Sequence, residues 1–182
     1  MGIALAFIEK SGFTSQGGHI VHTAVLIVDD DRDIRESLTD MLRHEGYLVE
    51  SAGSGNEALD QAKQRHYGAA ILDIQLPDLN GLSVLKVLME LDASLPVIIL
   101  TGNATSENTI GSLAKGAFAY LTKPYNAQEL KAIIRRAVSV KGLAVRAEHV
   151  EQALHASEER FRALVESATD AIVLADHCGH II

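Results

Sequence analysis

The fold is decided by the stretch Ala24-Val25-Leu26-Ile27-Val28-Asp29-Asp30-Asp31, in which five apolar residues are followed at once by three carboxylates. Three further segments repeat this arrangement of an apolar run that ends on polar residues: Ala69-Ala70-Ile71-Leu72-Asp73, Val97-Ile98-Ile99-Leu100-Thr101 and Ala117-Phe118-Ala119-Tyr120-Leu121-Thr122-Lys123. The runs are too short for buried helices and lack polar alternation. They therefore predict parallel strands that are covered on both faces.

Stretches with helical periodicity separate these runs. The pattern predicts strands at about 24–29, 47–51, 69–73, 96–101 and 117–122, and helices at about 32–45, 55–66, 81–91, 105–115 and from 126 onward. Such alternation is typical of an α/β, doubly wound parallel sheet with right-handed crossovers. In these sheets ligands bind at the carboxyl ends of the strands, which is where the polar residues fall.

Taken together, these segments resemble the receiver domain of two-component response regulators. The resemblance rests on the acidic pair after the first strand, Asp73 followed by a Pro77-x-x-x-Gly81 turn, the Thr after the fourth strand and Lys-Pro after the fifth. It covers about residues 24–140 and implies a flavodoxin-like, five-stranded sheet of order 2-1-3-4-5. It also implies that Asp73 accepts a phosphoryl group from a sensor histidine kinase or phosphotransfer protein, and that the domain then switches conformation to control an output or partner.

The acidic residues at the strand ends predict a metal site. The carboxylates of Asp29, Asp30 and Asp73 should lie close enough to repel one another, and Mg²⁺ is the hard cation that carboxylates and phosphate oxygens share. The resemblance implies that Asp30 and Asp73 ligate Mg²⁺ directly, that Asp29 acts mainly through water, and that the backbone carbonyl of Gln75 is a further ligand.

The other polar residues suit phosphoryl transfer. Asp73 is the expected nucleophile, and the ammonium of Lys123 can stabilise the transferred group. Thr101 offers a hydroxyl to a phosphoryl oxygen, and Tyr120 stands where receivers carry an aromatic switch, although a strand Tyr can also simply pack. Pro124 allows a cis bond after Lys123, which the resemblance favours.

Simpler structural roles account for other acidic and polar residues. Asp31 and Asp33 are expected to cap the helix at 32–45, which leaves Asp29 and Asp30 to the pocket. Asp78 and Asn80 are expected to be turn residues before the helix at 81–91.

Two other functions remain open at the level of sequence. One is a receiver-like scaffold that binds proteins without phosphorylation. The other is a phosphohydrolase with an Asp nucleophile, which would need a second Asp two positions after Asp73, where Gln75 stands. We therefore expect a module that catalyses its own phosphorylation and dephosphorylation and is not otherwise an enzyme.

Composition bears on the partners and the cellular location of the protein. The 182 residues include 16 Lys and Arg against 24 Asp and Glu, a formal charge of −8, which disfavours a nucleic-acid surface. Cys178 is the only cysteine, so an internal disulfide is excluded and a cytoplasmic location is expected. The longest apolar runs are too short to span a membrane.

The chain on either side of the receiver carries different signals. Residues 1–23 predict a poorly ordered extension and 141–156 a helical linker, while SEERFRALVESATDAIVLAD (157–176) resembles the opening of a PAS domain, so we expect 157–182 to be an incomplete PAS segment. Apolar residues in one three-four register predict a coiled-coil connector and a homodimer, with a helix packed on its own domain as the alternative: Ile133, Val140, Leu143, Ala147, Val150, Leu154, Phe161 and Leu164.

Overall fold

A computed structural model of the whole chain describes residues 23–102 and 116–167. Its strands are β1 (Ala24–Val28), β2 (Leu48–Ala52), β3 (Ala69–Asp73), β4 (Val97–Thr101) and β5 (Ala119–Thr122). They form one five-stranded sheet in the order β2-β1-β3-β4-β5 in which every neighbouring pair is parallel. The predicted fold class and strand order are confirmed, and each predicted strand begins and ends within two residues of the observed one.

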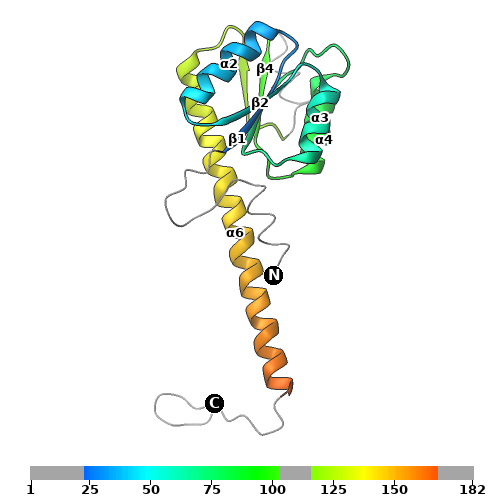
Figure 1. Cartoon of the computed structure of the whole chain (residues 1–182), viewed down its shortest axis with the longest axis vertical. Coiled ribbons are helices and arrows are strands. Elements are labelled where there is room, and N and C mark those ends of the chain that lie inside the picture. The colour runs from blue at the N-terminus through cyan, green and yellow to red at the C-terminus, as the bar shows by residue number, and fades with distance from the viewer. Residues whose placement is uncertain (1–22, 103–115, 168–182) are drawn as a thin grey trace. The chain divides into compact units, whose positions relative to one another are not determined.

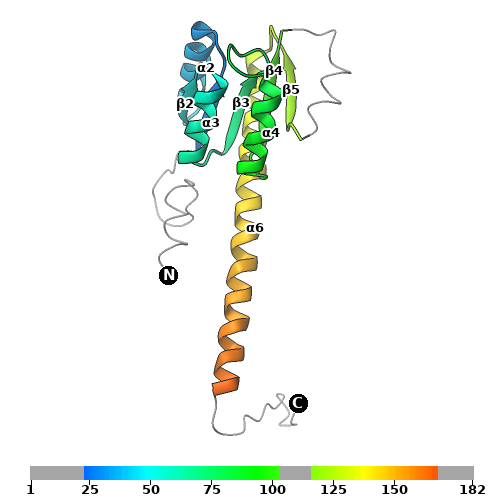
Figure 2. The same cartoon turned by 90° about the vertical axis from the view of Figure 1, so that its right-hand side faces the viewer.

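The described helices form a layer on each face of this sheet (Figures 1 and 2). They are α2 (Arg32–His44), α3 (Gly55–Gln64), α4 (Gly81–Leu91) and α6 (Ala127–Ser167). Side chains of α2 and of the first turns of α6 share one core cluster, and those of α3 and α4 share the other. The helix predicted at 105–115 and the segments 1–22 and 168–182 lie outside the described residues.

The buried strands explain why the sheet is covered on both faces. Every residue of β1, β3 and β4 is buried. Within β1, Leu26 and Val28 belong to the core under α3 and α4, whereas Val25 and Ile27 belong to the core under α2 and α6. Alternate side chains therefore enter opposite cores, which accounts for the continuous apolar run in the sequence. The edge strand β2 is more exposed.

Local signals set the ends of the helices. Asp31 caps α2, because its carboxylate accepts hydrogen bonds from the backbone N–H groups of Asp33 and Ile34. Asn80 caps α4 in the same way. Gly46, which has a φ of +88°, follows α2 at the predicted stop. The predicted capping role of Asp31 is thus confirmed, whereas Asp33 lies inside the first turn of α2. Asn80, expected to be a turn residue, caps α4.

Helix α6 is continuous over 41 residues, from Ala127 to Ser167. The predicted boundary between receiver and linker at residue 140 is therefore not a break in secondary structure. By internal contacts the chain divides into two compact units, residues 1–143 and 144–182. In the first unit, Leu130, Ile134 and Ala137 of α6 are buried in the core that they share with α2. Among the described residues, helices that are both long and apolar enough to cross a membrane are absent.

Candidate functional site

The register of the sheet brings the predicted site residues to one edge. Val28 pairs with Leu72 across β1 and β3, so Asp29 and Asp73 follow on neighbouring strands. The backbone N–H of Lys123 donates to the carbonyl of Thr101 at 2.7 Å, which fixes the residue after β5 beside the end of β4. Residues that lie up to 94 positions apart in sequence thus converge, as the alternation of strands and helices predicted.

Three carboxylates gather at this edge. Asp29, Asp30 and Asp73 each place one carboxylate oxygen so that all three atoms lie within 4.8 Å of one another. Asp29 is 1% exposed and Asp73 6% exposed, whereas Asp30 is open to solvent. The arrangement concentrates negative charge at a partly buried point, where repulsion between the carboxylates is poorly screened.

Lys123 compensates this charge. Its ammonium lies 2.6 Å from Oδ2 of Asp29 and 2.6 Å from Oδ2 of Asp73, so one cation bridges two strands. Burial alone would lower the pKa of Lys123, but the hydrogen bonds to Asp29 and Asp73 outweigh it and raise that pKa. The side chain therefore stays an ammonium at neutral pH and is available to an anionic ligand of this pocket.

Asp29 is the most enclosed of the carboxylates. Burial raises its pKa, although the hydrogen bonds from Lys123 and from the backbone N–H of Asp31 act in the opposite direction. Positive charge placed near Asp29 therefore favours its ionised form. Lys123, and any metal ion bound between the carboxylates, would therefore stabilise the ionised carboxylates of the pocket.

The turn after β3 is tightly built around Asp73. Oδ1 of Asp73 accepts a hydrogen bond from the backbone N–H of Gln75 at 3.1 Å, and the N–H of Gly81 donates to the carbonyl of Ile74 at 2.9 Å. A Cβ atom on Gly81 would lie 2.3 Å from the carbonyl oxygen of Asp73, so only glycine fits there. This N–H contact joins Gln75 to Asp73, and the predicted role of the Gln75 carbonyl as a metal ligand stays a prediction.

The remaining predicted residues lie in the last part of β4 and in β5. Thr101 is 6% exposed at the end of β4, and Tyr120 is 40% exposed in β5. Gly102 leaves open space beside Thr101, because a Cβ atom there would meet no atom within 4 Å. The Lys123-Pro124 bond is cis, as the resemblance favoured.

Two supporting contacts were not expected from the sequence. Nη1 of Arg35 donates to the backbone carbonyl of Asp29 at 2.6 Å, which ties α2 to the acidic loop. Asp78, expected to be a plain turn residue, accepts hydrogen bonds from the N–H groups of Gly55 and Asn56 at the start of α3. The only sequence signal for the Arg35 contact was its position one turn after the cap Asp31. The sequence contained no signal for the contact of Asp78 with α3.

The donor set fits a hard divalent cation. Three carboxylate oxygens within one small volume are ligands of the kind that Mg²⁺ takes, and the solvent-exposed Asp30 leaves room for coordinated water. The pocket can therefore bring together a cation, an ammonium and a carboxylate nucleophile. That combination suits an incoming phosphoryl group, whose oxygens need charge compensation on several sides.

Comparison with known proteins agrees with this geometry. The sequence model of the response regulator receiver domain matches residues 25–135. The probable transcriptional regulatory protein TcrX of Mycobacterium tuberculosis is 37% identical over 116 residues, which are 62% of this chain and 50% of that protein. The matched region covers between 29% and 52% of the length of such curated relatives.

Solved structures give the same result. A CheY-like receiver domain protein from Methanospirillum hungatei is 36% identical, with a TM-score of 0.62 over 66% of this chain and 96% of that one. The response regulator TrrA from Thermotoga maritima, solved in complex with Mg²⁺-BeF, is 31% identical, with a TM-score of 0.59 over 63% of this chain and 98% of that one. By its sequence and its fold, this chain belongs to the response regulator receiver domain family of two-component systems.

Proposed function

We propose that this chain is a phosphoacceptor module of a two-component phosphorelay, in which Asp73 receives a phosphoryl group from a sensor histidine kinase or phosphotransfer protein. The observation that carries the proposal is the position of Asp73. Its carboxylate lies in the acidic cluster with Asp29 and Asp30 and 2.6 Å from the ammonium of Lys123. A protein-binding scaffold that worked without phosphorylation is the alternative, and such a scaffold would not need that arrangement.

The acidic cluster would hold Mg²⁺ through Asp30 and Asp73 directly, through Asp29 by way of water, and through the backbone carbonyl of Gln75. Support comes from the oxygen donors of this chain and from TrrA, a similar protein solved with Mg²⁺-BeF. When bound, the ion would neutralise charge on the carboxylates and on the phosphoryl oxygens.

The proposed module has three parts. The receiver comprises residues 24–140, the helical linker residues 141–156, and the start of a PAS segment residues 157–182.

Chemically, a carboxylate oxygen of Asp73 attacks the phosphorus of the donor phosphohistidine. A new P–O bond forms as the P–N bond breaks, and the electron pair returns to the imidazole nitrogen of the donor, so the product is an acyl phosphate. Lys123, already within reach of Asp73, then pairs with a phosphoryl oxygen. The module acts on itself alone, so it is not an enzyme in the usual sense.

Thr101 and Tyr120 would then change conformation in response to the phosphoryl group. Thr101 is the last residue of β4 at this edge of the sheet, and the open space beside Gly102 would let an incoming group approach it. Movement of Thr101 toward the phosphoryl group would free volume for Tyr120 to turn inward, which is a population shift between two packings. That shift would control the output or partner in the cytoplasm.

The long helix would pair two copies of the chain into a homodimer. Several large apolar side chains of α6 are exposed, beginning at Val140, whereas Val145 is buried. Ile133, which the sequence placed at the start of the same row, packs instead against the receiver core. The PAS proposal is compatible with α6, since residues 157–167, the described part of that segment, are helical.

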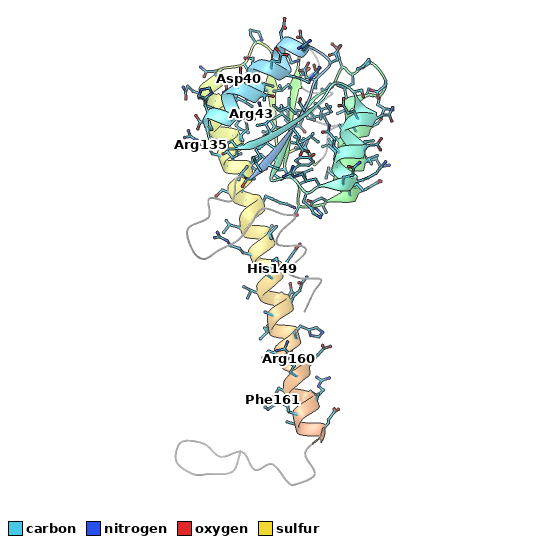
Figure 3. All side chains as sticks on the ribbon, in the orientation of Figure 1. Asp40, Arg43, Arg135, His149, Arg160 and Phe161 are labelled. Carbon is cyan, nitrogen blue, oxygen red and sulfur yellow. The ribbon has the colours of Figure 1, made fainter. Side chains whose placement is uncertain are left out.

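Intact-mass measurement after incubation with Mg²⁺ and acetyl phosphate tests the phosphoacceptor role. We expect one phosphoryl group on the wild type and on Asp40→Asn, a matched control on the exposed face of α2 (Figure 3), and none on Asp73→Asn. Uptake that persists in Asp73→Asn with equal yield and rate would show that Asp73 is not the acceptor. A wild type that binds Mg²⁺ but takes up no phosphoryl group would favour the scaffold.

A further inference from the structure

The distal part of α6 carries an exposed apolar row with a seven-residue repeat. Counting from Val140, the first and fourth residues of each repeat are the a and d positions of a heptad. Seven of these eight positions are apolar, and the exception is Ser157: Val140, Leu143, Ala147, Val150, Leu154, Ser157, Phe161 and Leu164. The large members are 48–69% exposed, so other described segments do not cover them. Figure 3 shows the side chains of this part of α6, with Arg160 and Phe161 labelled.

The regular spacing identifies the partner as a second helix of the same kind. A strict 3.5-residue repeat keeps one seam facing a partner only when two helices supercoil. The row from Val140 to Leu164 runs about 36 Å along the helix at 1.5 Å per residue, which is long enough for a stable seam. This step rests on the homodimer proposed above.

We infer that the two copies pair in parallel and in register, because of the charges beside the seam. Arg146 and Arg160 occupy g positions, and Glu151 and Glu158 occupy e positions, all of them exposed. In a parallel pair, a g residue faces the e residue five positions further along the partner helix. Arg146 then faces Glu151 of the second copy, and the symmetry of the dimer forms this pair twice.

An antiparallel pair would be opposed by the same charges. There, g residues face g residues and e residues face e residues, so Arg would meet Arg and Glu would meet Glu. Within the part of the chain that the structure describes, neither Arg146 nor Glu151 forms an ion pair. Both are therefore available to the partner helix.

Parallel pairing explains the remaining flanking positions as well. Arg160 faces Val165, where the apolar stem of the Arg can lie along the Val side chain. Glu158 faces Ala153, a contact without like-charge repulsion. The seam of both copies then begins at Val140, next to each receiver core, so a change at one receiver would act on a seam that both copies share.

Cysteine cross-linking of the full chain distinguishes the two orientations. In a Cys178→Ser background, Leu143→Cys and Phe161→Cys place single thiols near opposite ends of the seam, at a d and an a position, which would face each other in an antiparallel pair. In a parallel, in-register dimer each variant alone should form an intermolecular disulfide on mild oxidation, because like positions face each other within disulfide distance. In an antiparallel dimer neither alone would, while an equimolar mixture of the two would cross-link, and that result would overturn the inference.

Sedimentation of the reduced proteins shows whether the parallel orientation alone is wrong or whether the homodimer does not form at all. A monomeric wild type at tens of micromolar, or a dimer that persists after truncation at Val140, would remove pairing through α6. Neither result would affect phosphorylation of Asp73. A dimer that is lost on truncation but cross-links in the mixed pattern would instead preserve the homodimer and reject the parallel orientation.

Charge exchange gives an independent test. Arg146→Glu should weaken a parallel dimer several-fold at low salt, because Glu then faces Glu151 twice, and adding Glu151→Arg should restore the affinity. Glu148→Arg, at an outward b position of the same helix, makes the same charge change as Glu151→Arg and should leave the affinity unchanged. A tighter dimer with Arg146→Glu alone would indicate relief of Arg–Arg repulsion and so an antiparallel pair.

Discussion

The ammonium of Lys141, in α6, lies 2.7 Å from both carboxylate oxygens of Asp92, at the end of α4. Lys141 is 5% exposed, and it also donates to the hydroxyl of Ser94. Ser94 in turn donates to Asp92 from both its hydroxyl and its backbone N–H. This buried pair fixes α6 to the loop before β4 at the point where the helix leaves the receiver core.

Replacing Lys141 with Met should destabilise the receiver by about 1–3 kcal/mol. The apolar stem is kept, but the partly buried carboxylate of Asp92 loses its cation, and breaking one side of a buried pair is costly. Chemical denaturation of the receiver portion measures the change. Lys86→Met, at an exposed position of α4, removes the same charge and should alter the free energy of unfolding little. Equal effects of the two variants would show that the pair contributes nothing specific.

The same pair predicts a pH dependence. Burial would raise the pKa of Asp92, but hydrogen bonds from Lys141 and Ser94 outweigh it, so the pKa lies below the ordinary value of 3.8. Because the folded protein then binds fewer protons than the unfolded chain, this contribution is complete above the unfolded pKa and is lost as the pH falls through the folded pKa. The difference in Tm between wild type and Asp92→Asn should be constant near neutral pH and shrink below about pH 4. A difference that grows on acidification would contradict this assignment.

Gly81 and Gly102 offer a matched test of packing next to the site. A Cβ atom on Gly81 would lie 2.3 Å from the backbone carbonyl of Asp73, whereas one on Gly102 would meet no atom within 4 Å. We expect Gly81→Ala to cost about 2 kcal/mol or more, because the turn that holds Asp73 must shift. Gly102→Ala should stay within about 0.5 kcal/mol of the wild type. Similar losses from both would mean that the turn after β3 relaxes easily.

The sequence predicted the sheet and the pocket because both follow from the strands. Continuous apolar runs report burial on two faces, and the residue after each run must lie at the carboxyl edge, so Asp29, Asp73, Thr101 and Lys123 were placed without knowledge of any contact. The predicted metal ligands, by contrast, depend on the family resemblance, and they remain predictions.

Contacts between distant elements could not be predicted in this way. Lys141 and Asp92 are 49 positions apart, and a Lys in a helix ordinarily points into solvent. Gly142 lies within α6, yet the helix continues through it, because one glycine costs a helix only about 1 kcal/mol. Whether such residues are buried or exposed depends on packing between distant elements, which a local sequence pattern does not show.

Lys123 should compete with divalent cations for the acidic cluster. The ammonium bridges Asp29 and Asp73, so Lys123→Met leaves two buried carboxylates without their cation. We expect a lower Tm in EDTA and a larger rise in Tm on titration with Mg²⁺ than in the wild type, because an ion that binds the folded state more tightly stabilises it more. Lys86→Met again serves as the control.

Phosphoryl uptake by Lys123→Met should be slower but not abolished, since Asp73 remains while one source of charge stabilisation is lost. Coupling to Thr101 and Tyr120 should weaken as well, which NMR of the phosphorylated protein can follow. The competition between Lys123 and Mg²⁺ predicts that Asp73→Asn has the opposite effect and reduces the rise in Tm with Mg²⁺, because it removes a carboxylate. If Lys123→Met and the wild type instead respond equally to Mg²⁺, the ammonium does not share the carboxylates with the ion, and its role is confined to the phosphoryl group.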